Sequence, residues 1–259
     1  MIVREDKEGY YLFEQDRHAH LSGVFCEAWE DRFFKGLSKK RSVSLAITHH
    51  DRGWAALDKE MMLHHRKLSP LSFIDYPLKK KITAYEKGVD EMEEIDVYSA
   101  LLMSMHYTSF FKGKLDRLGC DYRSKEENRQ DRMKKKLLLS PRETNELDFH
   151  YDLLQFTDNL SLYVCMNEWG IEKEREVSWF MDGFPQQFDP LINERIQARW
   201  LSPSKVCLWP YPFYKSNLTV VVPYKYLKKE LIEIGEAQKI YNTIPFRYHM
   251  VTFVQEGDM

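Results

Sequence analysis

The sequence is poor in cysteine and lacks the closely spaced cysteine pairs that build thiolate metal sites. Its 259 residues include four cysteines, and no two of them form a CxxC motif. They are Cys26, Cys120, Cys165 and Cys207. Scattered thiols of this kind predict neither a disulfide framework nor a zinc ribbon, so we expect small core residues or surface thiols.

The sequence also lacks an excess of one charge and a long hydrophobic run. Its 38 Lys and Arg nearly balance 40 Asp and Glu, so composition indicates neither nucleic acid nor an anionic membrane as a partner. No apolar segment is long enough to span a bilayer, and the N-terminal MIVREDKEGYYLF carries acids where a signal peptide is apolar. We therefore expect a cytoplasmic protein, and the sequence leaves open whether it forms a homo-oligomer.

What the sequence does contain is helical periodicity between two segments rich in β-forming residues. The runs MIVRE and GYYLFEQ, separated by the turn-like DKEG, predict an N-terminal hairpin. From about Arg195 the chain becomes β-branched and aromatic, as in KVCLWPYPF and LTVVVPY. We predict a mainly α fold, with a helical body at residues 1–194 and a small antiparallel β extension at residues 195–259 packed on it.

Six segments of the body carry helix signals. The expected helices are 17–34 with Asp16 as N-cap, 42–50 ended by Gly53, 78–93, 96–113 capped by Asp96, 121–140, and 141–168 with Pro141 in the first turn. Alternating charge in SKEENRQDRMKKK predicts that the fifth helix is exposed.

Histidines in the first two helices share the phase of the apolar residues. His18 lies three residues before Leu21 on the same helical face, whereas His20 does not. In the second helix, His50 is the more interior histidine of the pair in HHDRGW. Asp51 follows it directly where the helix should end. An imidazole and a carboxylate from adjacent positions are therefore expected to converge.

Two later helices each place another polar residue in an apolar stripe. His106 lies over Leu102, and Asp158 lies one turn after Leu154. A buried aspartate is costly unless it is paired or bound to a metal. Four helices thus each direct a candidate ligand inward.

Each of these residues has a simpler interpretation on its own. A single inward histidine is more often hydrogen bonded to a backbone carbonyl, and Asp158 alone can cap a neighbouring helix. HHDRGW is also typical of a helix C-terminus, where a histidine suits the helix dipole. The coincidence of all four is harder to explain without a metal. Mixed imidazole and carboxylate ligands suit a divalent ion such as Mn, Fe, Co, Ni or Zn.

The same residues carry a resemblance to a known superfamily. His18, the doublet His50 and Asp51, and Asp158 look like the H…HD…D signature of the HD-domain metal-dependent phosphohydrolases. The segments HAHLSG, HDRGW, SFIDYP, MHYTSFF and DNLSLYVCMNE further resemble a bacterial family catalogued only as a domain of unknown function, with no established activity. The superfamily resemblance implies an HD-type helical bundle in which these four residues hold a divalent metal. The histidine pairs of dinuclear members are not matched, which argues against a second metal.

The resemblance implies a divalent-metal-dependent hydrolase. It would cleave a phosphoester of a nucleotide or other small phosphorylated molecule through a metal-bound hydroxide. Asp51 would then be both a ligand and a catalytic residue, and Arg52, with Arg17, would compensate charge on the transferred group. Asp75 or His106 would manage protons. Superfamily members with lyase or oxygenase chemistry keep an oxygenase as an alternative.

Two other classes of protein remain open. One is a non-catalytic helical metal-binding or regulatory interaction protein that uses the aromatic tail KVCLWPYPFYK as a partner surface, although such a segment also suits a small core. The other is a helical protein whose polar core groups are satisfied without metal. His64 and His65 are expected in a loop, either as a solvated surface or as substrate-binding residues.

Overall fold

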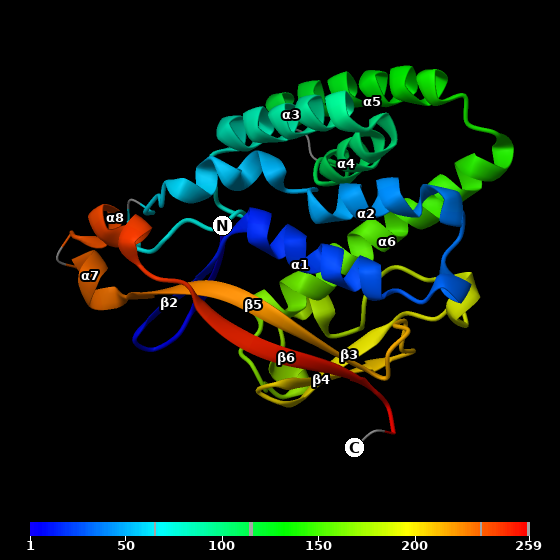
Figure 1. Cartoon of the computed structure of the whole chain (residues 1–259). Helices are drawn as coiled ribbons and strands as arrows, with labels where there is room; N and C mark the ends of the chain where they lie inside the picture. The colour runs from blue at the N-terminus through cyan, green and yellow to red at the C-terminus, as the bar shows by residue number, and fades with distance from the viewer. Residues whose placement is uncertain (65, 114–115, 234, 258–259) are drawn as a thin grey trace.

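The strands of the protein form one six-stranded sheet, and the long helices stack on one side of it (Figure 1). The computed structural model describes residues 1–64, 66–113, 116–233 and 235–257. Its strands are β1 (Ile2–Glu5), β2 (Gly9–Phe13), β3 (Gln197–Ser202), β4 (Lys205–Trp209), β5 (Asn217–Lys228) and β6 (Arg247–Gln255). Its α-helices are α1 (Gln15–Ala28), α2 (Lys40–Thr48), α3 (Leu78–Ile95), α4 (Val97–Ser109), α5 (Arg117–Leu137), α6 (Pro141–Met166), α7 (Lys229–Glu233) and α8 (Ala237–Ile240). Among the short 3-10 helices are η3 (Arg52–Ala55), η4 (Leu57–Lys59) and η6 (Ser178–Phe180).

Both ends of the chain contribute to the sheet. The strand order is β1-β2-β5-β6-β4-β3. The long strand β5 pairs antiparallel with β2 near its C-terminal end and with β6 along most of its length. β6 then pairs in parallel with β4, whereas β1 with β2 and β3 with β4 are antiparallel. The sheet is therefore mixed, and it joins the N-terminal hairpin to the C-terminal strands.

The predicted fold class, a mainly α HD-type bundle with a small antiparallel extension, is wrong. The hairpin and the strands after residue 195 are present, but they belong to one mixed sheet. The reason is a pairing between remote segments, because Gly9–Leu12 lies beside Lys225–Lys228. Periodicity within a short window carries no information about such a partner. The division into residues 1–194 and 195–259 stays a prediction.

Helices α1 and α6 lie between the sheet and the remaining long helices (Figure 1). They pack on each other, α1 also contacts β5, and α6 contacts β1. One hydrophobic core runs through these layers, from Phe253 of β6 through Phe25 and Leu160 to Leu102 of α4. In the described parts of the chain, no helix is both long and apolar enough to cross a membrane.

Helix α1 starts and ends differently from the prediction. It begins at Gln15, before the expected N-cap Asp16, and it ends at Ala28. The backbone N–H of Gln15 donates to Oδ2 of Asp58 at 2.7 Å. Asp58 comes from η4, far along the chain, and satisfies a donor that a local N-cap would otherwise take. A cap from a distant residue leaves no local sequence signal.

The predicted starts of α4 and α6 are confirmed. Asp96 precedes α4, and its Oδ1 accepts a hydrogen bond from the backbone N–H of Ser99 at 2.7 Å. Ser140 and Glu143 form a reciprocal capping box at the start of α6, with Pro141 in the first turn. These caps are local, so the sequence alone predicts them.

Helix α5 is exposed along much of its length, as its charge pattern predicts, but one stripe is buried. Glu126, Gln130 and Met133 pack toward α4. There Ser104 donates to Glu126 at 2.7 Å, which gives the buried carboxylate a partner. A charged residue of α5, Glu126, therefore also helps to hold α5 on α4.

The sequence suggested that Gly53 ends the second helix, and this prediction is wrong. α2 ends at Thr48, and Gly53 lies in η3 against α3. A Cβ atom added at Gly53 would lie 2.1 Å from the backbone oxygen of Ala84. Glycine is required here by close approach to another helix rather than by a helix terminus.

Candidate metal centre

Five buried side chains from four parts of the chain meet inside the helical layers. His18 comes from α1, His50 and Asp51 follow α2, and His106 and Asp158 come from α4 and α6. Nε2 of His18 lies 3.1 Å from Oδ2 of Asp51 and 3.6 Å from Oδ1 of Asp158. Nε2 of His50 lies 3.4 Å from Oδ1 of Asp158, and Nε2 of His106 lies 3.7 Å from its Oδ2. The structure thus brings together the four expected ligands and His106.

The ligand atoms of this His/Asp cluster fall into two overlapping groups. His18, His50 and Asp51 form one group, and His50, His106 and Asp158 form the other. Within each group, one nitrogen or oxygen atom per residue lies within 4.8 Å of the others. Imidazole and carboxylate together suit first-row divalent ions. Either group is able to hold a metal ion.

Hydrogen bonds fix which nitrogen of each histidine faces the cluster. Nδ1 of His50 lies 2.7 Å from the carbonyl oxygen of Ile47, which can only accept, so Nδ1 carries a proton. Nδ1 of His18 lies 2.6 Å from the Ser161 hydroxyl, which itself donates to the backbone oxygen of Asp158. Nδ1 of His18 must therefore be the donor. When either ring is neutral, its lone pair is therefore on Nε2, the atom that faces the carboxylates, as in metal sites with ordered outer-shell partners.

The cluster leaves a buried polar atom without a hydrogen bond. Among the described residues, Nε2 of His50 has no hydrogen-bond partner, although it lies between Asp51 and Asp158. A buried nitrogen in that position is satisfied either by a proton that pairs with the carboxylates or by a cation. The donor set and this orphaned atom fit a divalent ion.

Burial and neighbouring charges set the protonation of the cluster. Burial opposes a charge on His50, but the carboxylates of Asp51 and Asp158 outweigh it and raise its pKa to about 9. Burial also opposes a charge on Asp158, yet its contact with the charged His50 lowers its pKa to about 2. Burial lowers the pKa of His106 to about 4. A metal that binds Nε2 of His50 at neutral pH must therefore displace a proton.

Two residues outside the cluster form hydrogen bonds that hold the His50–Asp51 segment in place. The side-chain amide of Gln15 donates to Oδ2 of Asp51 at 3.0 Å. The Tyr107 hydroxyl donates to the backbone oxygen of His50. These contacts fix the turn after α2 from α1 and from α4, so the orientation of Asp51 does not depend on α2 alone.

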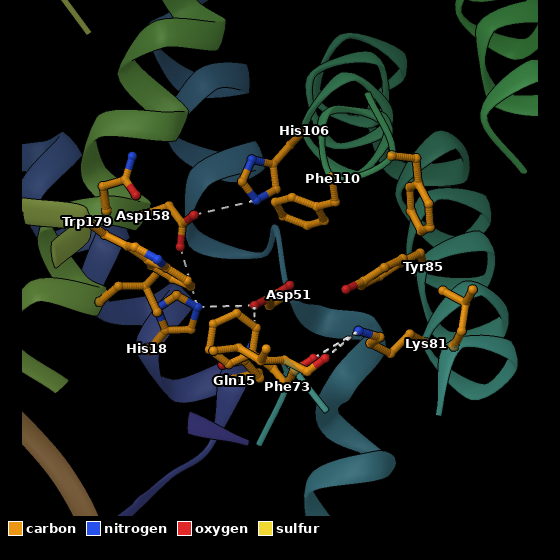
Figure 2. Close-up of a pocket in the computed structure, with 15 residues that line it drawn as sticks. Gln15, His18, Asp51, Phe73, Lys81, Tyr85, His106, Phe110, Asp158 and Trp179 are labelled. Atoms are coloured by element: carbon orange, nitrogen blue, oxygen red, sulfur yellow. Dashed lines mark hydrogen bonds and ion pairs between the residues drawn. The ribbon is translucent and has the colours of Figure 1, made fainter. Parts of the chain in front are cut away.

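Four of the five cluster residues, all except His50, form the floor of a pocket of about 350 Å³. Figure 2 shows His18, Asp51, His106 and Asp158 facing one another, with aromatic side chains around them. Gln15, Lys81 and Asn159 are further polar residues of the lining. A divalent ion held by these residues would be reached from the pocket.

Comparison with known families decides which family the protein belongs to. Residues 1–229 match the family described as "Protein of unknown function (DUF3891)". The chain belongs to this family. No curated protein and no solved structure matches it. The expected likeness to a family of uncharacterised proteins is confirmed, whereas nothing in these comparisons links the chain to the HD superfamily.

Two residues proposed for catalysis lie outside the pocket of this DUF3891 protein. The Arg52 guanidinium pairs with Glu91 at 3.1 Å on the surface of α3. Asp75 is exposed and accepts a hydrogen bond from the Ser72 hydroxyl at 3.3 Å. Neither side chain lines the pocket, so the cluster does not place them at a substrate. Their catalytic roles stay predictions.

Two other histidines, His64 and His150, also bond to groups outside the cluster. His150 is buried between the Tyr98 hydroxyl and the backbone oxygen of Lys35, each at 2.7 Å. It has structural partners on both ring nitrogens. His64 accepts hydrogen bonds from backbone N–H groups of its own loop, and His65 lies outside the described residues.

The sequence reasoning missed two polar residues that support the DUF3891 cluster. Gln15 precedes His18 by three residues, and Ser161 follows Asp158 by three. Residues three apart share a helical face, so the same phase argument that selected the ligands would have found their supports.

Ser161→Ala is expected to lower the affinity for a divalent metal by about 10–100-fold without unfolding the protein. The substitution removes the oxygen that accepts from Nδ1 of His18, and loss of such an outer-shell partner has an effect of this order. Isothermal titration of metal into the purified protein measures the change. Ser44→Ala on α2, where a half-buried hydroxyl outside the cluster donates to Glu27, is the matched control. Equal affinities for both variants would contradict the positioning role.

Proposed function

We propose that the protein is a divalent-metal-dependent hydrolase that cleaves a phosphoester of a small molecule. The observation that carries this proposal is the orientation of His18 and His50, whose Nε2 atoms face Asp51 and Asp158 at the floor of a pocket. A fixed set of imidazole and carboxylate ligands beside an open cavity is the arrangement that catalytic metal sites require. The proposal rests on this geometry and not on the superfamily resemblance.

Residues around the cluster orient the candidate ligands and set the protonation state of His106. A divalent ion in the cluster would lower the pKa of a water molecule and polarise a phosphoryl oxygen. Gln15 holds the Asp51 carboxylate in place, and Ser161 fixes the ring of His18. Burial keeps His106 neutral at physiological pH. Its Nε2 is then able to serve as a ligand or to accept a proton near Asp158.

The positive charge at the pocket comes from a residue other than the expected arginines. Arg17 pairs with Glu14 and lies over the ring of Phe246 at 4.0 Å, and Arg52 pairs with Glu91. Lys81 of α3 lines the pocket instead. We assign to it the charge compensation that the sequence suggested for the arginines.

Turnover of model substrates by metal-loaded protein tests the proposal. The metal-free protein would be reconstituted separately with Mn, Fe, Co, Ni and Zn and assayed with p-nitrophenyl phosphate and bis-p-nitrophenyl phosphate. We expect hydrolysis that requires metal and that falls more than about 100-fold in Asp158→Asn. Asp148→Asn, on the exposed face of the same helix, should keep the parent rate. Stoichiometric metal without turnover of either ester would favour the non-catalytic metal-binding alternative.

A further inference from the structure

Two pairs of aromatic side chains line the pocket between the His/Asp cluster and the mouth, and each pair forms one wall. Phe73 and Trp179 form one wall, with ring centroids 6.4 Å apart and nearly perpendicular planes. Phe110 and Tyr85 form the other, with centroids 6.0 Å apart. Figure 2 shows the two pairs on different sides of the space in front of Asp51. A group bound in front of the cluster would therefore touch rings on more than one side.

The rim of the pocket is apolar and exposed. Trp179 is 51% exposed, Ile74 is 51% exposed and Phe110 is 38% exposed. These side chains come from η6, from the loop before α3 and from the end of α4, and all three line the same pocket. Large apolar groups that gather at a cavity mouth are typical of a surface that a ligand covers.

The pocket has little positive charge for a phosphorylated ligand. Among its described lining residues, Lys81 is the residue with a permanent positive charge, and Asp51 and Asp158 are acidic. The Lys81 ammonium donates to the backbone oxygens of Phe73 and Ile74 at 3.0 and 3.3 Å, which fixes it in the wall. With a divalent ion and neutral histidines, two carboxylates and one lysine leave a net charge of about +1. That charge matches a single phosphoryl group better than a polyphosphate chain.

The volume of the pocket also suits a small ligand with a single phosphoryl group. An apolar cavity of roughly 150 Å³ is able to hold benzene. The pocket of about 350 Å³ therefore has room for a group of that size together with one phosphoryl group.

We infer that the substrate is a phosphate monoester of an apolar alcohol or phenol, a refinement that rests on the proposed hydrolase function. The phosphoryl group lies at the His/Asp cluster near Lys81. The apolar group lies between the Phe73–Trp179 wall and the Phe110–Tyr85 wall and extends to the exposed rim. Lys81 is a specificity residue for the single phosphoryl group, and Trp179 is a specificity residue for the apolar part.

Binding of two phosphonates to the metal-loaded protein tests this inference without turnover. Phenylphosphonate and methylphosphonate carry the same anionic group and differ in the apolar part. Burial of the phenyl ring predicts that phenylphosphonate binds at least about tenfold more tightly in calorimetric titration. Trp179→Ala should remove most of this difference while methylphosphonate and metal affinity stay at the parent values. Lys81→Met should weaken both phosphonates alike.

Tyr248→Ala is the control, because Tyr248 is also a large aromatic side chain, 65% exposed, but lies on β6 away from the pocket. It should keep the parent preference for phenylphosphonate. Equal affinity of the parent for the two phosphonates, or an unchanged preference in Trp179→Ala, would overturn this inference and leave the hydrolase proposal standing. Failure of the protein to bind metal would overturn the proposed function, and this inference with it.

Discussion

Asp51→Asn is expected to lower the affinity for a divalent metal by more than about 100-fold while the protein stays folded. Loss of an outer-shell partner alone has an effect of about 10–100-fold, and Asp51 is itself a candidate ligand in contact with His18. Asparagine keeps the size of the side chain and an oxygen that accepts from Gln15. Elemental analysis after gel filtration, together with calorimetric titration, measures the loss.

The matched control for this variant is His49→Gln. His49 is next to His50, but it is half-buried and its ring faces His20, with centroids 5.2 Å apart, outside the cluster. The control should bind metal like the parent. Equal metal content in Asp51→Asn and the parent would show that the metal is held elsewhere. Negligible metal in all three proteins after reconstitution would make the cluster a buried network of paired side chains.

Asp51→Asn also changes how the stability of the metal-free protein depends on pH. The pKa of His50 is about 9, above the ordinary histidine value of about 6.5. The ion pairs of His50 therefore stabilise the fold fully below about pH 6.5 and lose that contribution as the pH rises through 9. Asp51→Asn removes one of the carboxylates that raise this pKa, so the variant should lose less stability between pH 7 and 9.5. Denaturant unfolding at several pH values checks the slope.

Gly53→Ala is expected to destabilise the protein by about 1–3 kcal/mol or more. The new Cβ atom would lie 2.1 Å from the backbone oxygen of Ala84, so η3 and α3 must separate. A flexible side chain could move away from such a contact, but a carbonyl group within a helix cannot do so alone. Urea unfolding measures the change in free energy.

Gly53→Ala should also lower the affinity of the site for metal and for phosphonates. η3 follows Asp51 directly, and α3 carries Lys81 and Tyr85 into the pocket, so their separation moves both sides of the cavity. We expect lower metal and phosphonate affinity than in Ala55→Ser, an exposed change in the same turn that should alter stability by less than about 0.5 kcal/mol. A Gly53→Ala protein as stable as the parent would contradict the close packing of η3 on α3.

The helix caps show which features of the fold are predictable from the sequence alone. Asp96 and the Ser140–Glu143 capping box were predictable, because both partners lie within one helical turn. The cap of α1 was not, because Asp58 is remote from Gln15. The prediction of the fold class was wrong for the same reason, since β2 pairs with β5, which lies near the other end of the chain.

The sequence by itself determined which polar groups face inward. The helical phase of His18, His106 and Asp158 depends on neighbours within a turn or two, and each of these side chains is buried as expected. The same phase argument predicted that His50 is inside and His20 exposed, and both are so, although His50 lies beyond the end of α2.

Only the tertiary structure decided that these inward groups meet. An inward face has many possible partners, and packing of α1, α4 and α6 selects one arrangement in which three imidazoles and two carboxylates share a space. The same packing turned Arg52 outward to Glu91 and brought Lys81 to the pocket, although Arg52 is next to Asp51 in sequence. Local periodicity fixes the direction of a side chain relative to its own helix, whereas its neighbours follow from contacts between segments far apart in the chain.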